Sequence, residues 1–434
     1  MANIRDIADK TYEYVKGIDG LKADFTISET ETNEITMKDG KFTLFRTLFD
    51  QDVSVKVIRN NKRGLGSINK CTEEDVKKAI DDALVSAEAG DEDENFDIAP
   101  GMEPQEFKMG VLEPDIDKFM ERIEELSKAI AEKHKKIKVM EICAKYVKSY
   151  STFRNTNGTL DETEAGYYSI MVEFAGSDGD ETTGISGTSV VFDNLDKELI
   201  TLGSIEKDLS DAENSLSPIS LQEKFTGEII FTPACVSQML FYTFGNTVID
   251  SAIIGGTSVW RDKVGERVVS DKLTISSNPW DKRIIVNEVH TQDGFRSEDY
   301  TLIEKGELKC FATSLYAANK CKVNRAANSS VDLVIEAGDV SYEDMVKSVK
   351  KGLIVGSVSC GMPGPNGEIS GVAKNSFYVE NGEIKGAVIE TMISTNLFDM
   401  FNRVKAVSTE QLCNGMMVVP YIQCEGVTIS GKTE

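Results

Sequence analysis

The chain has 434 residues and a formal net charge of −24, from 48 Lys and Arg against 72 Asp and Glu. Its 40% hydrophobic and 28% charged residues are ordinary for a soluble globular protein. The acidic balance argues against direct contact with nucleic acid, which needs clustered Lys and Arg, and against binding to an anionic membrane surface. The absence of any apolar run of about 18 residues argues against a membrane span.

The cysteine pattern indicates the redox environment. Eight cysteines are scattered along the chain, with no C-x-x-C pair and no dense framework. Disulfide-stapled secreted domains show the opposite pattern, so we expect reduced thiols in a cytoplasmic protein.

Residues 1–90 predict a compact N-terminal α+β unit. Apolar residues recur at helical spacing over 4–15, and the sequence then alternates between apolar and polar residues over 22–68. Turn signals at Asp39-Gly40 and Asn60-Asn61 divide these residues into strands. Thr72 with Asp75 forms a variant capping box that opens a covering helix.

Residues 105–215 predict a second α+β unit, reached through an acidic, turn-rich linker over 91–104. Apolar positions from Ile116 to Ile130 predict a helix, and strands follow from Ile137 to about Phe192 with a hairpin signal at Asn157-Gly158. Residues 196–216 read as helical. The order of helix, strands, hairpin and strands therefore occurs twice, which indicates either an old duplication or two similar units.

Residues 216–434 predict a mostly β C-terminal domain, barrel- or sandwich-like, around a central helix. After a short apolar strand, Thr232 can cap this helix and Pro233 suits its first position. Apolar residues recur every four positions from Val236 to Val248, so we predict a buried helix with aromatic core residues. Two further helices are predicted at 342–351 and 396–402. The fold class is α+β.

Few side chains suit metal or acid–base chemistry. His134 lies in a Lys-rich helix end and is expected to face solvent. His290 lies near Glu288 and Asp293, a trio that could hold a metal, although a polar strand end explains the same residues. Cys413 is a lone thiol near the end of the sequence. Free cysteines are often buried, so we expect Cys413 to be a small core residue.

Five segments in the second half, in order, resemble the TldD/PmbA family. They are residues 301–308 (TLIEKGEL), 314–318 (SLYAA), 352–355 (GLIV), 377–384 (FYVENGEI) and 390–397 (ETMISTNL). The central helix also resembles the signature helix of this family, whose proteolytic branch carries His-Glu-x-x-x-His there. The matching positions in this chain are Phe241, Tyr242 and Asn246, which cannot supply zinc ligands and a general base.

The resemblance implies the non-catalytic TldE branch of the family, also labelled modulator of DNA gyrase. It implies a partner, a TldD-like metalloprotease subunit that carries zinc, and unfolded peptides as substrates for maturation or degradation. It also implies a homodimer in isolation and no zinc in this chain. Cys413 falls where the proteolytic branch has its third metal ligand, and two prolines interrupt the loop 358–371 that is Gly-rich in relatives.

Two alternatives remain open from the sequence. One is a metallopeptidase that acts alone, with His290, Glu288, Asp293 and Cys413 rebuilt into a metal site. The other is a peptide-binding homodimer without protease activity.

Overall fold

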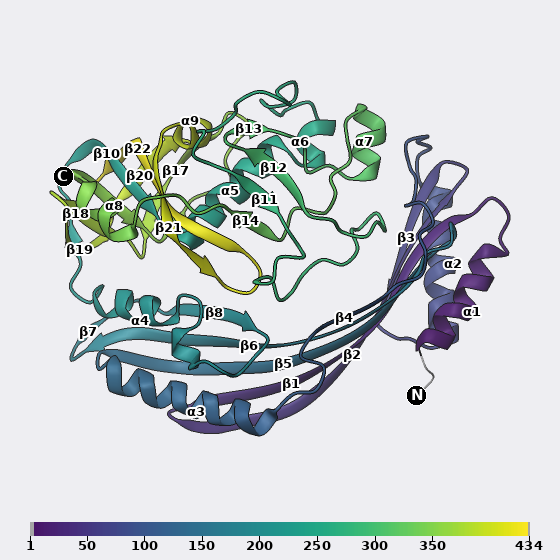
Figure 1. The fold of residues 1–434 in the computed structure, drawn as a ribbon, viewed down its shortest axis with the longest axis horizontal. Coiled ribbons are helices and arrows are strands. Elements are labelled where there is room, and N and C mark those ends of the chain that lie inside the picture. The colour runs from purple at the N-terminus through teal and green to yellow at the C-terminus, as the bar shows by residue number, and fades with distance from the viewer. Residues whose placement is uncertain (1–3, 433–434) are drawn as a thin grey trace.

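The computed structural model describes residues 4–432 and has two parts, a long curved N-terminal sheet and a compact C-terminal domain. Figure 1 shows the sheet as a half-barrel, with the C-terminal domain above its concave side. The mixed α+β fold predicted from the sequence is confirmed. No helix within residues 4–432 has the length and apolar character that a membrane crossing requires.

The N-terminal part contains two sets of elements with the same order. The first set is α1 (Ile4–Lys16), β1 (Lys22–Lys38), β2 (Lys41–Arg59), β3 (Lys62–Ile68) and α2 (Glu73–Ala89). The second set is β4 (Glu106–Gly110), α3 (Ile116–Lys133), β5 (Ile137–Asn155), β6 (Leu160–Asp178), β7 (Glu181–Thr182), β8 (Ser186–Phe192), the 3-10 helix η1 (Leu199–Thr201) and α4 (Ile205–Glu213). Each set has two long strands and a seven-residue strand between two helices.

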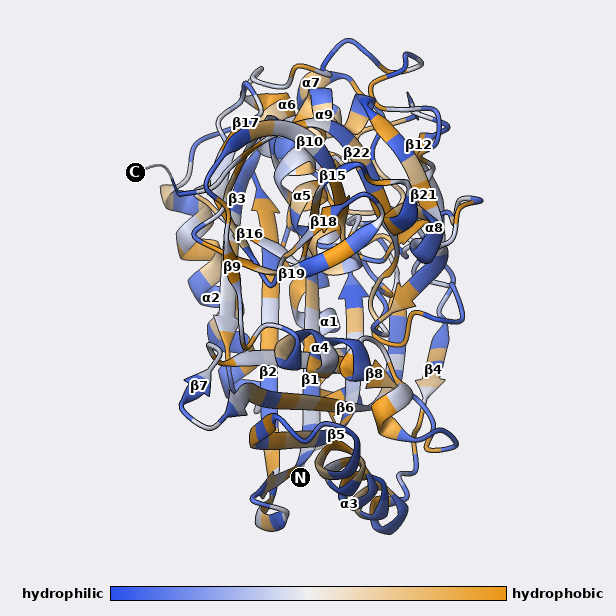
Figure 2. Ribbon diagram, turned by 90° about the vertical axis from the view of Figure 1, so that its left-hand side faces the viewer, coloured by the Kyte–Doolittle hydropathy of each residue, from blue (hydrophilic) through white to orange (hydrophobic). Residues whose placement is uncertain are grey.

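The two sets share one continuous sheet. Its strand order is β3-β2-β1-β5-β6-β4, and β7 and β8 also pair with β6. The antiparallel ladder between β1 and β5 joins the sets, with Asp24 opposite Asn155 at one end and Met37 opposite Ile142 at the other. Figure 2 shows hydrophobic and hydrophilic bands alternating along these strands, as expected for a sheet with one face packed on helices.

Helices α1, α2 and α3 begin where the sequence predicts, whereas the helix predicted over 196–216 is divided into η1 and the shorter α4, which begins only at Ile205. Thr72 caps α2 by accepting a hydrogen bond from the Asp75 backbone N–H. The prediction that His134 faces solvent is wrong, because this residue ends α3 with only 5% of its surface exposed. Its Nδ1 lies 3.0 Å from a carboxylate oxygen of Glu213 at the end of α4. The Lys-rich surroundings concealed this contact, which joins residues far apart in the sequence.

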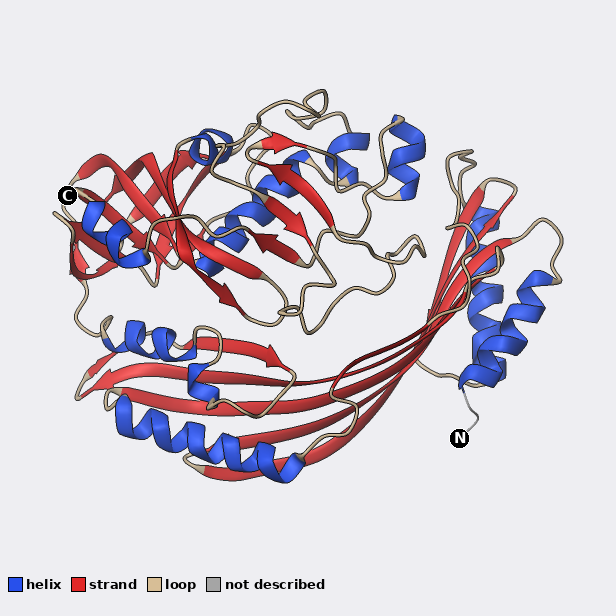
Figure 3. Ribbon diagram, viewed as in Figure 1, coloured by secondary structure: helices blue, strands red, loops and turns tan. Residues whose placement is uncertain are grey.

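The C-terminal domain is built from short strands around one long helix (Figure 3). Its elements are β9 (Ile219–Ser220), β10 (Lys224–Phe231), α5 (Pro233–Thr247), α6 (Asp250–Ile254), β11 (Ile275–Ser277), β12 (Tyr300–Glu304), β13 (Glu307–Leu308), α7 (Leu315–Cys321), β14 (Leu333–Ile335), α8 (Tyr342–Ser348), β15 (Lys351–Val355), β16 (Ser357–Ser359), β17 (Glu368–Lys374), β18 (Phe377–Glu380), β19 (Glu383–Ile389), β20 (Met392–Asn396), α9 (Leu397–Asn402), β21 (Val404–Cys413) and β22 (Val418–Ser430). Strand β22 pairs with β10, β14, β20 and β21 and is the hub of this sheet.

Candidate functional site

Helix α5 begins directly after the buried strand β10. Thr232 accepts a hydrogen bond from the Cys235 N–H and donates one to the Gly356 carbonyl, and Pro233 occupies the first turn. The core side of the helix carries Val236, Met239 and Leu240, which pack in the main hydrophobic cluster of the domain. These contacts fix which side of the helix remains open.

Phe241 lies on the open side of α5. Its side chain is 67% exposed, so the prediction that it is an aromatic core residue is wrong. The physical reason is helical geometry, since each residue advances about 100° around the axis and Leu240 already faces the core. Tyr242 and Asn246 are partly buried, and Gly245 has open space around it. The positions that match the zinc helix of the family therefore lie on the accessible side of α5.

Tyr242 and Asn246 help to hold a loop against the helix. Gln238 bonds to both the N–H and the carbonyl of Val358, at 3.0 and 2.9 Å, and donates to the Tyr242 hydroxyl at 3.2 Å. The Asn246 amide donates to the Pro363 carbonyl at 3.4 Å. The loop that follows Val358 is thus tied to the side of α5 that carries a metal site in the proteolytic branch.

The chemistry of these side chains does not fit zinc. Phenylalanine has no lone pair, and a carboxamide is a weak ligand for this metal. Burial raises the pKa of the Tyr242 hydroxyl, which keeps it a neutral phenol and a poor base. Within residues 4–432, no group of three or more His, Cys, Asp or Glu side chains is arranged to bind a metal ion.

Cys413 points away from α5. Its neighbours Leu412 and Asn414 line a cavity of about 220 Å³ together with Ala234 and Ser237 of α5. Because side chains alternate along a strand, Cys413 faces the other side, where its thiol donates to the Arg283 carbonyl at 3.2 Å. Burial raises the pKa of this thiol, which disfavours the thiolate that a metal requires.

The trio of His290, Glu288 and Asp293 is not assembled either. The Glu288 carboxylate accepts hydrogen bonds from the Ser297 hydroxyl and the Ser329 N–H. The Asp293 carboxylate accepts one from the Leu315 N–H, at 2.7 Å. Each carboxylate has its own backbone or hydroxyl donor, and His290 points elsewhere.

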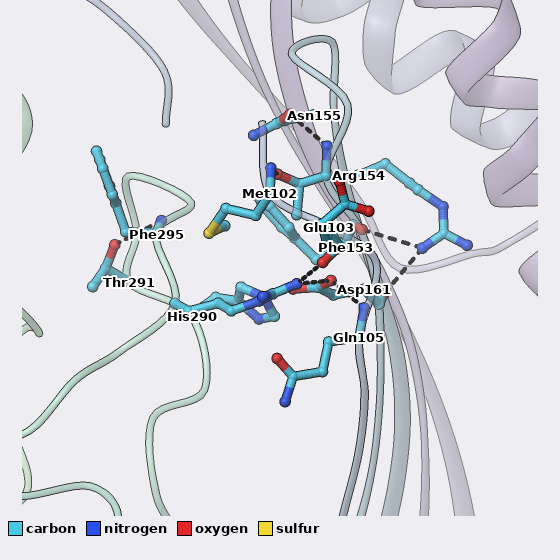
Figure 4. A network of polar contacts seen from close by, with 12 residues as sticks. Met102, Glu103, Gln105, Phe153, Arg154, Asn155, Asp161, His290, Thr291 and Phe295 are labelled. Atoms are coloured by element: carbon cyan, nitrogen blue, oxygen red, sulfur yellow. Dashed lines mark hydrogen bonds and ion pairs between the residues drawn. The ribbon is translucent and has the colours of Figure 1, made fainter. Parts of the chain in front are cut away.

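His290 contacts Asp161, at the start of β6 in the other part of the molecule (Figure 4). Its Nε2 lies 2.8 Å from Asp161 Oδ2, and its ring stacks on Phe153 with the centroids 4.7 Å apart. Arg296 donates two hydrogen bonds to the same carboxylate, of 2.8 and 2.7 Å. The Gln105 backbone N–H also donates to this carboxylate. This cluster anchors the C-terminal domain to the curved sheet.

Asp161 is fully buried, with 0% of its surface exposed. Burial alone would raise the pKa of its carboxyl group, but the hydrogen bonds from His290 and Arg296 outweigh that effect and hold the pKa at about 2. The carboxylate therefore remains charged at neutral pH. Hydrogen-bond donors from other residues occupy both oxygens of the Asp161 carboxylate. This geometry indicates that Asp161 is a structural anchor.

The depressed pKa predicts a loss of stability in acid. An unfolded Asp has a pKa near about 3.9, so the native state holds its charge more tightly and is favoured above that pH. We expect stability on the order of 2–3 kcal/mol to be lost progressively as the pH falls from about 5 to about 1, through both pKa values. Urea unfolding across this range, compared with Asp161→Asn, measures the contribution. Equal acid sensitivity of the two proteins would contradict it.

Sequence reasoning missed Gln238, Asp161 and Arg296. His290 and Asp161 are 129 residues apart, and no short motif connects them. Gln238 lies within the central helix, where a polar residue among apolar ones was the only available signal.

Comparisons with known proteins show to which family this chain is similar. Residues 225–431 match the PmbA/TldA metallopeptidase C-terminal domain, and residues 23–87 match domain 1 of the same metallopeptidases. A metalloprotease from Methanocaldococcus jannaschii is 25% identical, with 90% of each chain covered. A zinc metalloprotease TldD homolog from Saccharolobus solfataricus is 24% identical, with 92% of each covered.

Among solved structures, TldE from Thermococcus kodakarensis superposes with a TM-score of 0.85 at 20% identity, covering 99% of this chain and 100% of the other. The two domain matches lie in the expected order, and the relatives are aligned over almost their whole length. The chain belongs to the TldD/PmbA family.

Proposed function

We propose that this chain is the non-catalytic, TldE-like subunit of a two-subunit metalloprotease. Its partner is a TldD-like chain that holds the zinc, and the pair processes or degrades unfolded peptides. The observation that carries the proposal is helix α5, which has an accessible side and no zinc ligands. Phe241 is exposed there, while Tyr242 and Asn246 lie beside the loop after Val358.

The curved sheet supports unfolded peptides as the substrate class. Phe25 and Ile27 of β1 pack against α1 and α2, so the alternate residues lie on the opposite face. This face carries hydroxyl groups, with Ser28 opposite Ser151 and Thr30 opposite Ser149. It also carries Phe153, which contacts His290, and so it faces the C-terminal domain. Hydroxyl side chains can donate hydrogen bonds to the backbone carbonyl groups of an extended peptide whatever its sequence, which suits unfolded peptides as substrates.

The chain acts in the cytoplasm and does not bind nucleic acid directly. All eight cysteines are free in the structure, which suits a reducing cytoplasm. The isolated chain forms a homodimer, and the net charge of −24 disfavours direct binding to nucleic acid.

Metal content is the first test. After dialysis we expect well under about 0.1 zinc per chain, because the side chains at the family positions cannot coordinate it. Elemental analysis measures this value, and a TldD-like subunit purified in the same way is the control. About one zinc per chain would contradict the proposal.

Cleavage of an unfolded peptide is the second test. The chain alone is expected to be inactive, and the TldD-like subunit is expected to need it for full activity. Metal-dependent cleavage by the pure chain, lost in Cys413→Ala, would instead favour an enzyme that acts alone.

A further inference from the structure

The cavity of about 220 Å³ beside α5 lies where the two parts of the molecule meet. Its walls come from β8 and α4 on one side, and from α5 and the turn between β21 and β22 on the other. In Figure 1, α4 and β8 lie directly below the C-terminal domain. A water molecule takes up about 30 Å³, so the cavity has room for a group of several non-hydrogen atoms.

The wall of the cavity is part acidic and hydroxyl-rich, and part apolar. Asp208 of α4 lines it together with Thr188 and Ser204. The Ser204 hydroxyl donates to the Asp208 carboxylate at 2.6 Å and lies 3.3 Å from the Thr188 hydroxyl. The apolar part includes Leu412 and Val419. A ligand that fits both parts carries a hydrogen-bonding polar group on a short carbon chain.

The negative charge of Asp208 has no cation beside it in the structure. Lys207, the next residue, donates to both carboxylate oxygens of Asp211 instead, at 2.9 and 2.8 Å. None of the residues that line the cavity, all of them within 4–432, is basic. Burial raises the pKa of the Asp208 carboxyl group, as expected when a charge is withdrawn from water without a counter-ion. Because buried charges are normally paired, the cavity is complementary to a cationic group.

The cavity also borders the accessible side of α5. Ala234 and Ser237 line it, and the exposed Phe241 follows Ser237 by four residues. Residues three and four apart are neighbours on one side of a helix, so these three form one stripe. A peptide that lies along this stripe reaches the cavity with one of its ends or with a side chain.

We infer that this cavity binds the primary ammonium group of an unfolded peptide, carried either by the N-terminus or by a lysine side chain. An ammonium group has three N–H donors, and the Asp208 carboxylate and the hydroxyl oxygens of Thr188 and Ser204 are suitable acceptors. The carbon atoms next to the ammonium group pack against the apolar part of the wall. The inference rests on the proposed function and names a chemical group by which its peptide substrates are held.

Peptide binding to the full-length chain without a partner tests the inference. Fluorescence anisotropy compares three short peptides labelled at the C-terminus: one with a free N-terminus and no lysine, the same peptide acetylated at its N-terminus, and the acetylated peptide with one internal lysine. The acetylated peptide without lysine is expected to bind at least about 10-fold more weakly than a peptide with an accessible amine, because it cannot form the charged hydrogen bonds. The peptide that retains tight binding identifies the source of the ammonium group.

Substitutions on the two walls of the cavity locate the binding. Asp208→Asn keeps the shape of the side chain but removes its charge, and should remove the difference between the amine and acetylated peptides. Glu206→Gln is the matched control, because Glu206 lies on the same helix, is half exposed beside Lys133 and does not line the cavity. Ala234→Leu fills the cavity from α5 without a change of charge and should weaken binding of the amine peptides. Circular dichroism confirms that the variants fold.

Two results would overturn the inference. One is equal binding of all three peptides by the wild-type chain. The other is binding of an amine peptide by Asp208→Asn as tightly as by the wild-type chain. These measurements use neither zinc nor the TldD-like subunit, so their failure is distinct from a failure of the proposed function, which the metal content and the cleavage assay measure.

Discussion

Asp161→Asn is expected to lower the free energy of unfolding by about 3–5 kcal/mol at pH 7, the range seen when one partner of a buried ion pair is removed. The carboxylate is fully buried, and it receives hydrogen bonds from Arg296, His290 and the Gln105 N–H. The amide is neutral and has only one acceptor oxygen, so Arg296 loses its counter-charge. Chemical denaturation at neutral pH measures the change.

Asp178→Asn is the matched control, because Asp178 ends the same strand β6 and forms a surface pair with Lys136. Both side chains of that pair are half exposed, so its loss should change the free energy of unfolding far less than the loss of the buried pair. Similar losses for the two variants would show that the His290 cluster does not anchor the two parts of the molecule.

Phe241→His, Tyr242→Glu and Asn246→His together are expected to introduce zinc binding, in the micromolar range rather than tighter. The new side chains lie on the accessible side of α5, but the third ligand is missing because Cys413 faces Arg283. Helix α5 is also regular through Gly245, and positions five apart lie roughly 140° apart around such a helix. At zinc ten times above the dissociation constant, stability should rise by about 1.4 kcal/mol.

Replacing Phe241 should lower the free energy of unfolding only slightly, because its ring is exposed and little apolar burial is lost. Tyr242 and Asn246 give up their hydrogen bonds to Gln238 and Pro363, which should cost about 1–2 kcal/mol without metal. A variant with Asn246→Ala in place of Asn246→His lacks the second imidazole and serves as the control. Equal zinc responses of the two variants would show that the imidazole introduced by Asn246→His is not a ligand.

Local elements were predictable because their signals lie within a few residues. The spacing from Ile4 to Val15 predicted α1, Thr72 with Asp75 predicted the start of α2, and Asp39-Gly40 predicted the turn between β1 and β2. Among the short elements, α8 and α9 correspond to the helices predicted at 342–351 and 396–402, but α7 and β4 were missed. Helix α7 is only seven residues long and ends at Lys322, a non-glycine residue in the left-handed region, and β4 lies in a polar stretch.

The candidate site was predictable only in part. The family positions on α5 followed from the resemblance, but no local signal indicated which side of the helix stays open. Aromatic character suggested burial for Phe241, whereas the helical phase set by Leu240 determined its exposure. The His290 anchor depends on a contact between two separate parts of the fold, which residue spacing cannot predict.

The position of β22 has a consequence for the order of folding during synthesis. This strand contacts β10, β14, β20 and β21, although it follows all of them in the sequence. Until it leaves the ribosome, β10 lacks a neighbour on one side, and apolar edges of the C-terminal domain remain open. The strands of the curved sheet end at Phe192 and its covering helices end at Glu213, so this part of the chain can form first. Nascent chains that stop before Val418 should therefore be bound by chaperones through the C-terminal half.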